Sequence, residues 1–234
     1  MRTSTKIPRC GLTPQPANLC GVLLILLASQ ALAASDYADQ MRDFSLALSH
    51  NELALASGNN RYPVELSQVT VSMLETDNDD VDFGLQLGNS YASLGNDNPS
   101  AGLSLNGYHL GLSAGTQLGN NPRLALQALA QYHYLSDSTA TTTVKLDWFE
   151  WQFSASLRLA LAPSWGLRLG AAYSGVDAQR RVTGSVYHTL AMDLADPLHG
   201  LLALEKLFPN GGRASITLLG GGRRGASLAF ARRF

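Results

Sequence analysis

Hydrophobic residues alternate with small or polar residues along most of the chain after Met41. In residues 81–87, Val, Phe and two Leu alternate with Asp, Gly and Gln, and similar alternation occupies residues 123–134, 151–159 and 167–174. A period of two is typical of β-strands that present one apolar face, whereas a helix repeats every 3.6 residues. The pattern therefore predicts an all-β chain.

Residues that favour turns separate these runs. Short breaks occur at residues 76–80, 119–122, 162–164 and 195–197, and longer polar stretches occupy 57–63, 92–101, 136–143, 175–180 and 209–225. Alternation of short and long connectors is typical of transmembrane β-barrels, whose periplasmic turns are short and whose outer loops are longer.

We therefore expect an antiparallel up-and-down transmembrane β-barrel of about ten strands, with eight or twelve as alternatives. An even number places both ends of the barrel on the same side. Leu46 and Leu48 have the opposite parity to Leu53 and Leu55, and a β-bulge at residues 49–52 would absorb that change. Residues 214–219 offer an eleventh strand, which we assign instead to the last outer loop. The expected strands are 43–56, 64–75, 81–91, 102–118, 123–135, 146–161, 165–175, 181–194, 198–208 and 225–234.

In such a barrel the apolar positions face lipid and the polar positions face the lumen. Ten strands enclose an interior only slightly wider than the one that side chains fill in an eight-stranded barrel. We therefore expect a plugged barrel, with a narrow channel as the alternative. Aromatic residues such as Trp148, Trp151 and Tyr173 lie toward strand ends, as in interfacial girdles. The charged residues expected in the lumen are Asp82, Arg123, Glu150, Arg158, Arg168, Arg181, Asp193 and Glu205.

The first 33 residues have the features of a secretory signal peptide. Arg2, Lys6 and Arg9 form a positive segment, residues 22–28 form an apolar segment, and Ala31-Leu32-Ala33 forms a cleavage site of small residues. The apolar run is shorter than the roughly 20 residues of a spanning helix. We expect cleavage near Ala33, which leaves residues 34–234 as the barrel domain.

Loss of this leader changes the composition. Cys10 and Cys20 leave with it, so the remaining 201 residues contain no disulfide and no thiolate. The leader holds three cationic residues and no acidic one, so the net charge falls from −1 to −4. Charged residues make up 15% of the whole chain, against roughly 25% in soluble domains, which agrees with lipid contact. The absence of a basic excess argues against nucleic acid as a partner.

The chain ends at Phe234, with Phe230 and Leu228 at the same parity. This pattern resembles the C-terminal signal of bacterial outer membrane barrels, and the resemblance implies recognition by the outer membrane assembly machinery. Residues 43–53, 166–173 and 225–234 together resemble the YfaZ-type outer membrane proteins. That resemblance implies a small barrel in the outer membrane of a Gram-negative cell, without a firmly assigned activity. We expect a monomer with a structural or surface-interaction role, in contact with outer membrane lipids and lipopolysaccharide.

We predict no catalytic, cofactor-binding or metal site. A barrel lipase needs a His and a Ser on one strand face, whereas His133 and Ser136 are three residues apart and His188 is followed by Thr189. Asp196 and His199 are also three apart, and the acidic pair at residues 79–80 lies in a turn at the wrong end for a barrel protease. A narrow pore for small solutes and a barrel enzyme acting on lipid or peptide are the alternatives.

Metal and phosphate motifs are absent from the sequence. The acidic residues 77–80 lack the ligand spacing of a calcium loop, and no GK[ST] follows the glycines of residues 220–225. Arg223 and Arg224 in that segment are candidates for contact with lipopolysaccharide phosphates. We interpret the single histidines as hydrogen-bonding groups of the lumen; they are His50, His109, His133, His188 and His199.

Overall fold

The computed structural model describes residues 41–76, 81–95, 103–119, 122–184 and 187–234. The expected signal peptide and the acidic residues 77–80 lie outside these ranges. Within them no helix has the length and hydropathy to cross a membrane. The described residues form eleven strands, which confirms the all-β prediction: β1 (Met41–Ser57), β2 (Asn60–Thr76), β3 (Val81–Leu94), β4 (Ser104–Leu118), β5 (Arg123–Ser138), β6 (Thr142–Ala162), β7 (Trp165–Gly184), β8 (His188–Leu194), β9 (Leu198–Leu207), β10 (Gly212–Gly221) and β11 (Arg223–Arg233).

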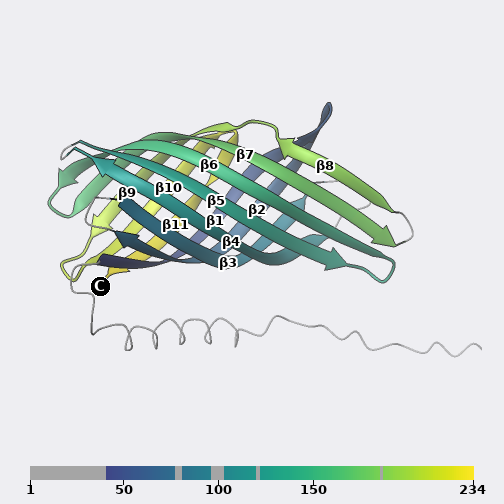
Figure 1. The fold of residues 1–234 in the computed structure, drawn as a ribbon, viewed down its shortest axis with the longest axis horizontal. Coiled ribbons are helices and arrows are strands. Elements are labelled where there is room, and N and C mark those ends of the chain that lie inside the picture. Colours follow the sequence, from purple (N-terminus) through teal and green to yellow (C-terminus); the bar gives the residue numbers. More distant parts are fainter. Residues whose placement is uncertain (1–40, 77–80, 96–102, 120–121, 185–186) are drawn as a thin grey trace, which may run out of the picture. The chain divides into compact units, whose positions relative to one another are not determined.

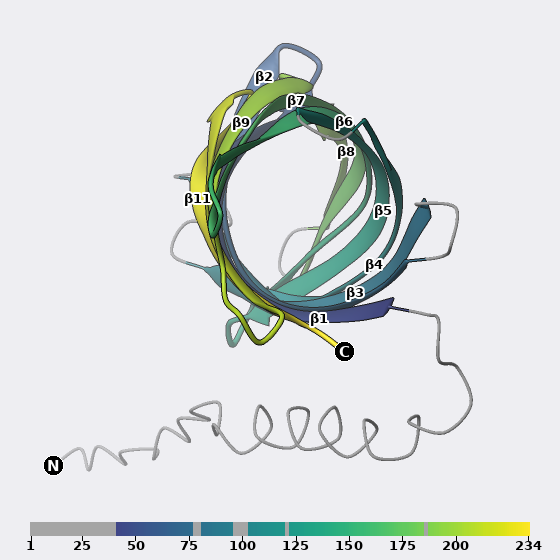
Figure 2. The same ribbon diagram turned by 90° about the vertical axis from the view of Figure 1, so that its left-hand side faces the viewer.

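Ten of these described strands form a closed antiparallel ring (Figure 2). Neighbours follow chain order from β1 to β7 and continue through β9, β10 and β11, which pairs back with β1. The closing pair extends from Asp43 opposite Arg233 to Leu53 opposite Arg223. A closed ring leaves no unpaired sheet edge. The up-and-down barrel and its count of ten strands are therefore confirmed.

The strands β8 and β9 lie toward opposite ends of the barrel (Figure 1). β8 pairs with residues 177–182 of β7, and β9 pairs with residues 165–173 of the same strand. β8 also reaches β1, where Leu194 lies opposite Leu55, beyond the end of the short hairpin of β10 and β11. Among the described strands, β1 to β8 thus surround one half, called here the distal half. The full ring surrounds the basal half, where β1 begins and β11 ends.

Two predicted strand boundaries are wrong, although the described ring still contains ten strands. Residues 165–175 and 181–194 were expected to be two strands, but residues 165–184 form the single strand β7. The break at 195–197 does not reverse the chain, because β8 and β9 both run antiparallel to β7. Residues 214–219, expected in an outer loop, belong to β10, which pairs with β9 and β11.

The predicted bulge in β1 is also wrong. The register of β1 with β2 continues without a shift from Met41 to Ser57. Instead, the polarity of the two faces reverses along the strand. Leu48 points outward in the basal half and is 48% exposed, whereas Leu53 and Leu55 point inward in the distal half and are buried.

The same reversal extends around the barrel. In the basal half, large apolar side chains point outward and form what we call the apolar belt. In the distal half, outward positions are polar, so Arg181 and Asp193 are exposed on the outside and not in the lumen as predicted. The belt includes Leu48, Phe83, Leu85, Leu87, Leu110, Leu112, Leu126, Phe153, Leu157, Leu169, Leu202, Leu204, Ile216, Leu218, Leu228 and Phe230.

Candidate functional site: the interior of the barrel

Apolar side chains fill the interior of the distal half. Leu105, Leu135 and Leu146 have no exposed surface, and they belong to one cluster of contacting residues. Side chains fill the interior of a barrel with about eight strands, which is the number around this half. We call this cluster the distal core; it includes Leu53, Leu55, Val64, Leu66, Leu105, Leu135, Val144, Leu146, Trp148, Val182 and Met192.

A buried ion pair crosses the lumen next to the distal core. Arg223 on β11 donates a hydrogen bond from Nη2 to Oε1 of Glu150 on β6, at 2.6 Å. The Glu150 side chain is 2% exposed and that of Arg223 is 12% exposed. Along the ring, β10, β9 and β7 separate β11 from β6, so the pair connects opposite parts of the wall.

Two histidines extend this polar layer. The Nε2 atom of His133 lies 3.7 Å from Oε2 of Glu150, and its ring stacks on Trp148 with 4.2 Å between centroids. Trp148 therefore belongs to the interior and not to an interfacial girdle. His109 lies opposite His133 in the β4–β5 register, with 5.6 Å between ring centroids.

His109 also contacts two hydroxyl groups. Its Nδ1 lies 2.9 Å from Oγ of Ser90, and its Nε2 lies 3.0 Å from Oγ1 of Thr70. A Ser next to a His is the beginning of a nucleophilic site, but such a site must also admit substrate. Ser90 and His109 are 0% and 1% exposed, so we interpret their contact as a buried hydrogen bond inside the barrel.

The spacing of the two histidines in the sequence indicates their contact, although neither histidine does so when considered alone. His109 and His133 are equally distant from the turn at residues 119–122, and a hairpin places such residues opposite each other. His199 is also buried, whereas His50 is outside and contacts Ser67 at 2.9 Å. Within the described ranges, no three His, Cys, Asp or Glu side chains gather closely enough to hold a metal ion.

The other candidate residues are separated by the wall. Asp196 forms a 2.9 Å ion pair with Arg61, whereas His199 is buried. Arg223 binds Glu150 inside, and Arg224 is exposed outside. Only one arginine of this pair therefore faces the surroundings.

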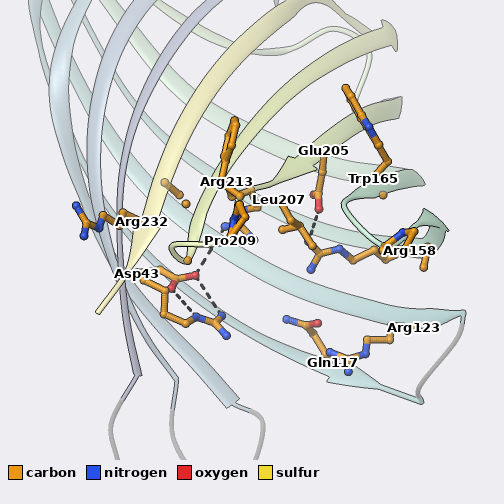
Figure 3. A pocket seen from close by; sticks show the side chains of 18 of the residues that line it. Asp43, Gln117, Arg123, Arg158, Trp165, Glu205, Leu207, Pro209, Arg213 and Arg232 are labelled. Carbon is orange, nitrogen blue, oxygen red and sulfur yellow. Dashed lines mark hydrogen bonds and ion pairs between the residues drawn. The ribbon is translucent and has the colours of Figure 1, made fainter.

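A cavity of about 630 Å³ occupies the basal half (Figure 3). We call it the basal cavity. Its wall contains charged residues from the beginning of β1, the end of β11 and the basal ends of several other strands. The charged residues that line it are Asp43, Asp82, Arg123, Arg158, Glu205, Arg213, Arg232 and Arg233. Figure 3 shows the Arg232 side chain directed away from the others.

Two carboxylates hold arginines in pairs along this wall. Glu205 accepts a hydrogen bond from Arg158 and lies 3.8 Å from Nε of Arg168. Asp43 accepts a 2.8 Å hydrogen bond from Nε of Arg233 and lies 3.8 Å from Nη2 of Arg213. Figure 3 shows Glu205 directed toward Arg158, and Asp43 close to Arg213. Each buried carboxylate thus serves two guanidinium groups.

Most of the predicted lumen charges are confirmed. Asp82, Arg123, Arg158 and Glu205 line the basal cavity, and Glu150 lies in the polar layer. Arg168 joins them through Glu205. The two exceptions, Arg181 and Asp193, belong to the distal half, where the inward positions are apolar.

Comparisons with known proteins bear on the fold. No protein-family model and no curated protein matches the sequence. Among solved structures, the chain is similar to the translocator domain of the autotransporter NalP from Neisseria meningitidis, at 13% identity and a TM-score of 0.48, over 93% of this chain and 97% of that chain. It is similar to the outer membrane protease OmpT from Escherichia coli, at 9% identity and a TM-score of 0.47, over 84% and 97% of the two chains. It is also similar to the COG4313 outer membrane channel from Pseudomonas putida F1, at 11% identity and a TM-score of 0.44, over 86% and 98%. At these identities the likeness concerns the course of the chain alone.

Proposed function

We propose that the chain is a closed outer membrane β-barrel that does not conduct solutes, and that its distal half projects above the membrane as a rigid structure. The observation that carries this proposal is the reversal of polarity along the wall. An outward apolar face is stable in lipid, whereas an inward apolar core with a polar exterior is stable in water.

The apolar belt has the dimensions of a membrane-spanning band. On β4 it extends from Tyr108 to Leu118, which at about 3.4 Å per residue and a tilt of about 40° gives a height of roughly 25 Å. Bacterial outer membrane barrels carry an apolar band about 25 Å tall, flanked by aromatic residues. Exposed aromatic side chains lie at both limits, with Tyr108, Tyr132 and Phe149 toward the distal half and Trp165 and Phe234 at the basal end.

The distal half has the surface of a protein in water. Its outward positions include Glu52, Glu65 and Asp177, which are exposed, while Leu66 and Leu105 are buried inside. Charged side chains at the lipid face of a barrel are unfavourable near the bilayer midplane, by about 2–4 kcal/mol for Arg and Lys and by less for Asp and Glu. The distal strands therefore stand outside the hydrocarbon region, on the outer side if the chain termini are periplasmic.

Two layers inside the barrel support a closed state. The distal core fills the interior with apolar side chains, and the ion pair between Glu150 and Arg223 crosses the lumen next to it. The basal cavity therefore lies on the basal side of this polar layer. A structural or surface-interaction role fits this arrangement better than transport.

Planar-bilayer recording tests this function. The protein is extracted from outer membranes and refolded, and heat-modifiable mobility in a detergent gel verifies that it is folded. It is then inserted into a bilayer, with a general porin as the positive control. We expect no steady unit conductance. Steady conductance steps from the folded protein would overturn the closed barrel and favour the narrow pore for small solutes.

Membership of the YfaZ-type outer membrane proteins stays a proposal, as does recognition of Phe234 by the assembly machinery. The Phe234 side chain is 52% exposed, and its backbone pairs with Arg42 at the junction of β1 and β11. Contact with lipopolysaccharide phosphates is proposed for Arg224 alone, because Arg223 is engaged by Glu150 inside the barrel.

A further inference from the structure

We propose that the basal cavity binds a small anion that carries at least two phosphate or carboxylate groups. The inference depends on the cavity and its arginines. Only the compartment to which the cavity opens, the periplasm, rests on the proposed function.

The basal cavity has an excess of positive charge. Figure 3 shows Arg232 directed away from the cavity, so it is left out of the charge count. The other described side chains that line the cavity, together with Arg168, hold five guanidinium groups and three carboxylates, which leaves two positive charges in excess. A cavity with a protein wall concentrates such a potential, because the wall has a low dielectric constant. Arg168 of the Glu205 pair lies within electrostatic range of Arg213 of the Asp43 pair, so the two arginine pairs repel each other. An anion between them would relieve that repulsion.

Two of the three carboxylates that line the cavity are less exposed than the arginines they bind. The side chains of Glu205 and Asp43 are 5% and 11% exposed. Arg158, Arg168 and Arg213 are 26%, 33% and 32% exposed. The guanidinium groups of these pairs are therefore more accessible than the carboxylates that anchor them.

The anchored arginines are arranged to donate to a ligand. A guanidinium group has five N–H donors, and the bonds to one shared carboxylate use only part of them. Arginine binds phosphate and carboxylate groups through two parallel hydrogen bonds, which favours planar or tetrahedral oxyanions over chloride. Two pairs of arginines, one on Glu205 and one on Asp43, match an anion with two such groups. The volume of about 630 Å³ lies within the range of small-molecule sites.

Titration calorimetry with inorganic pyrophosphate tests the site, using the folded full barrel in a non-ionic detergent. The test variant is the double substitution Arg158→Gln and Arg213→Gln, which removes one arginine from each pair. Glu205 then keeps Arg168, and Asp43 keeps Arg233, so neither carboxylate loses both partners. The control is Arg181→Gln, which removes one positive charge from the outer surface, where Arg181 lies 3.7 Å from Asp147. Heat-modifiable mobility verifies that each variant is folded.

We expect pyrophosphate to bind the unmodified protein and the control equally. Each removed arginine should weaken binding by about tenfold or more, since a hydrogen bond to a charged group contributes about that much. Absence of pyrophosphate binding, or equal binding by the double variant, would overturn the proposal. A conducting barrel would overturn the proposed function but would not change this result.

A second arm identifies the source of the phosphate. The same titration is carried out in vesicles of phosphatidylcholine and in vesicles that also contain phosphatidylglycerol. A free anion as natural ligand predicts equal affinity in both. A lipid headgroup predicts weaker pyrophosphate binding in the anionic vesicles, because the headgroups compete for the same arginines.

Discussion

Arg223 and Glu150 form an ion pair across the barrel lumen, with 2.6 Å between the guanidinium nitrogen and the carboxylate oxygen. The pair connects the last strand, β11, to β6, and it separates the basal cavity from the distal core. Both charges are withdrawn from water, so each one depends on the other for compensation. This dependence makes the pair the most informative place to disturb the interior.

Substitution Arg223→Ala should destabilise the barrel by about 3–5 kcal/mol, because it leaves the Glu150 carboxylate buried without its partner. The measurement is reversible urea unfolding in lipid vesicles. Arg224→Ala is the matched control, since Arg224 is the next residue and points outward. Its effect should stay within about 0.5 kcal/mol. Equal effects of the two substitutions would show that the pair does not compensate buried charge.

The distal core predicts different effects for two leucines on β4. Leu105 is 0% exposed inside the barrel, whereas Leu110 is 52% exposed on the apolar belt. Leu105→Ala should lower the free energy of unfolding by about 2–5 kcal/mol, because the surrounding side chains cannot fill the cavity it leaves. Leu110→Ala should have a smaller effect, since lipid chains occupy the space. A larger effect at Leu110 than at Leu105 would contradict a packed core inside the barrel.

A glycine accommodates the indole ring of Trp151 on the outer surface. Gly175 lies opposite Trp151 in the β6–β7 register, and a Cβ atom at Gly175 would be 2.4 Å from the indole ring. Gly175→Ala should therefore displace the ring, change the tryptophan fluorescence, and destabilise the barrel by about 1–3 kcal/mol. Gly200→Ala is the control, because a Cβ atom there meets nothing closer than 3.8 Å. Unchanged fluorescence in Gly175→Ala would contradict this contact.

The period of two in the sequence was sufficient to predict most of the strands, the closed ring and most charges of the lumen. It was not sufficient to predict the two halves. Alternation shows that a strand has two different faces, but it does not show which face is inside. Leu48 and Leu53 differ in parity because Leu48 points outward in the basal half and Leu53 points inward in the distal half. The bulge was a wrong interpretation of that change.

The same ambiguity explains the wrong strand boundaries. In residues 175–180 the outward positions are polar, with Asp177 exposed, while Val176 and Ala178 are buried inside. A lipid-facing strand would have apolar residues at these outward positions. Because they are polar, the segment was interpreted as a loop. The residues of β10 were assigned to a loop for another reason, because an eleventh strand would have made the count odd. The basal arginine pairs connect β1 with β10 and β11, and β6 and β7 with β9, and such contacts depend on register across the whole ring.

The most direct test of the polarity reversal compares two outward positions on β4. Residues 34–234 contain no cysteine, so Leu112→Cys in the apolar belt and Asn106→Cys in the distal half each introduce a unique thiol. Each is labelled with an environment-sensitive fluorophore in vesicles and exposed to brominated lipids or to aqueous iodide. The reversal predicts quenching by the brominated lipid at position 112 and quenching by iodide at position 106. Equal quenching of both positions by the same quencher would contradict it.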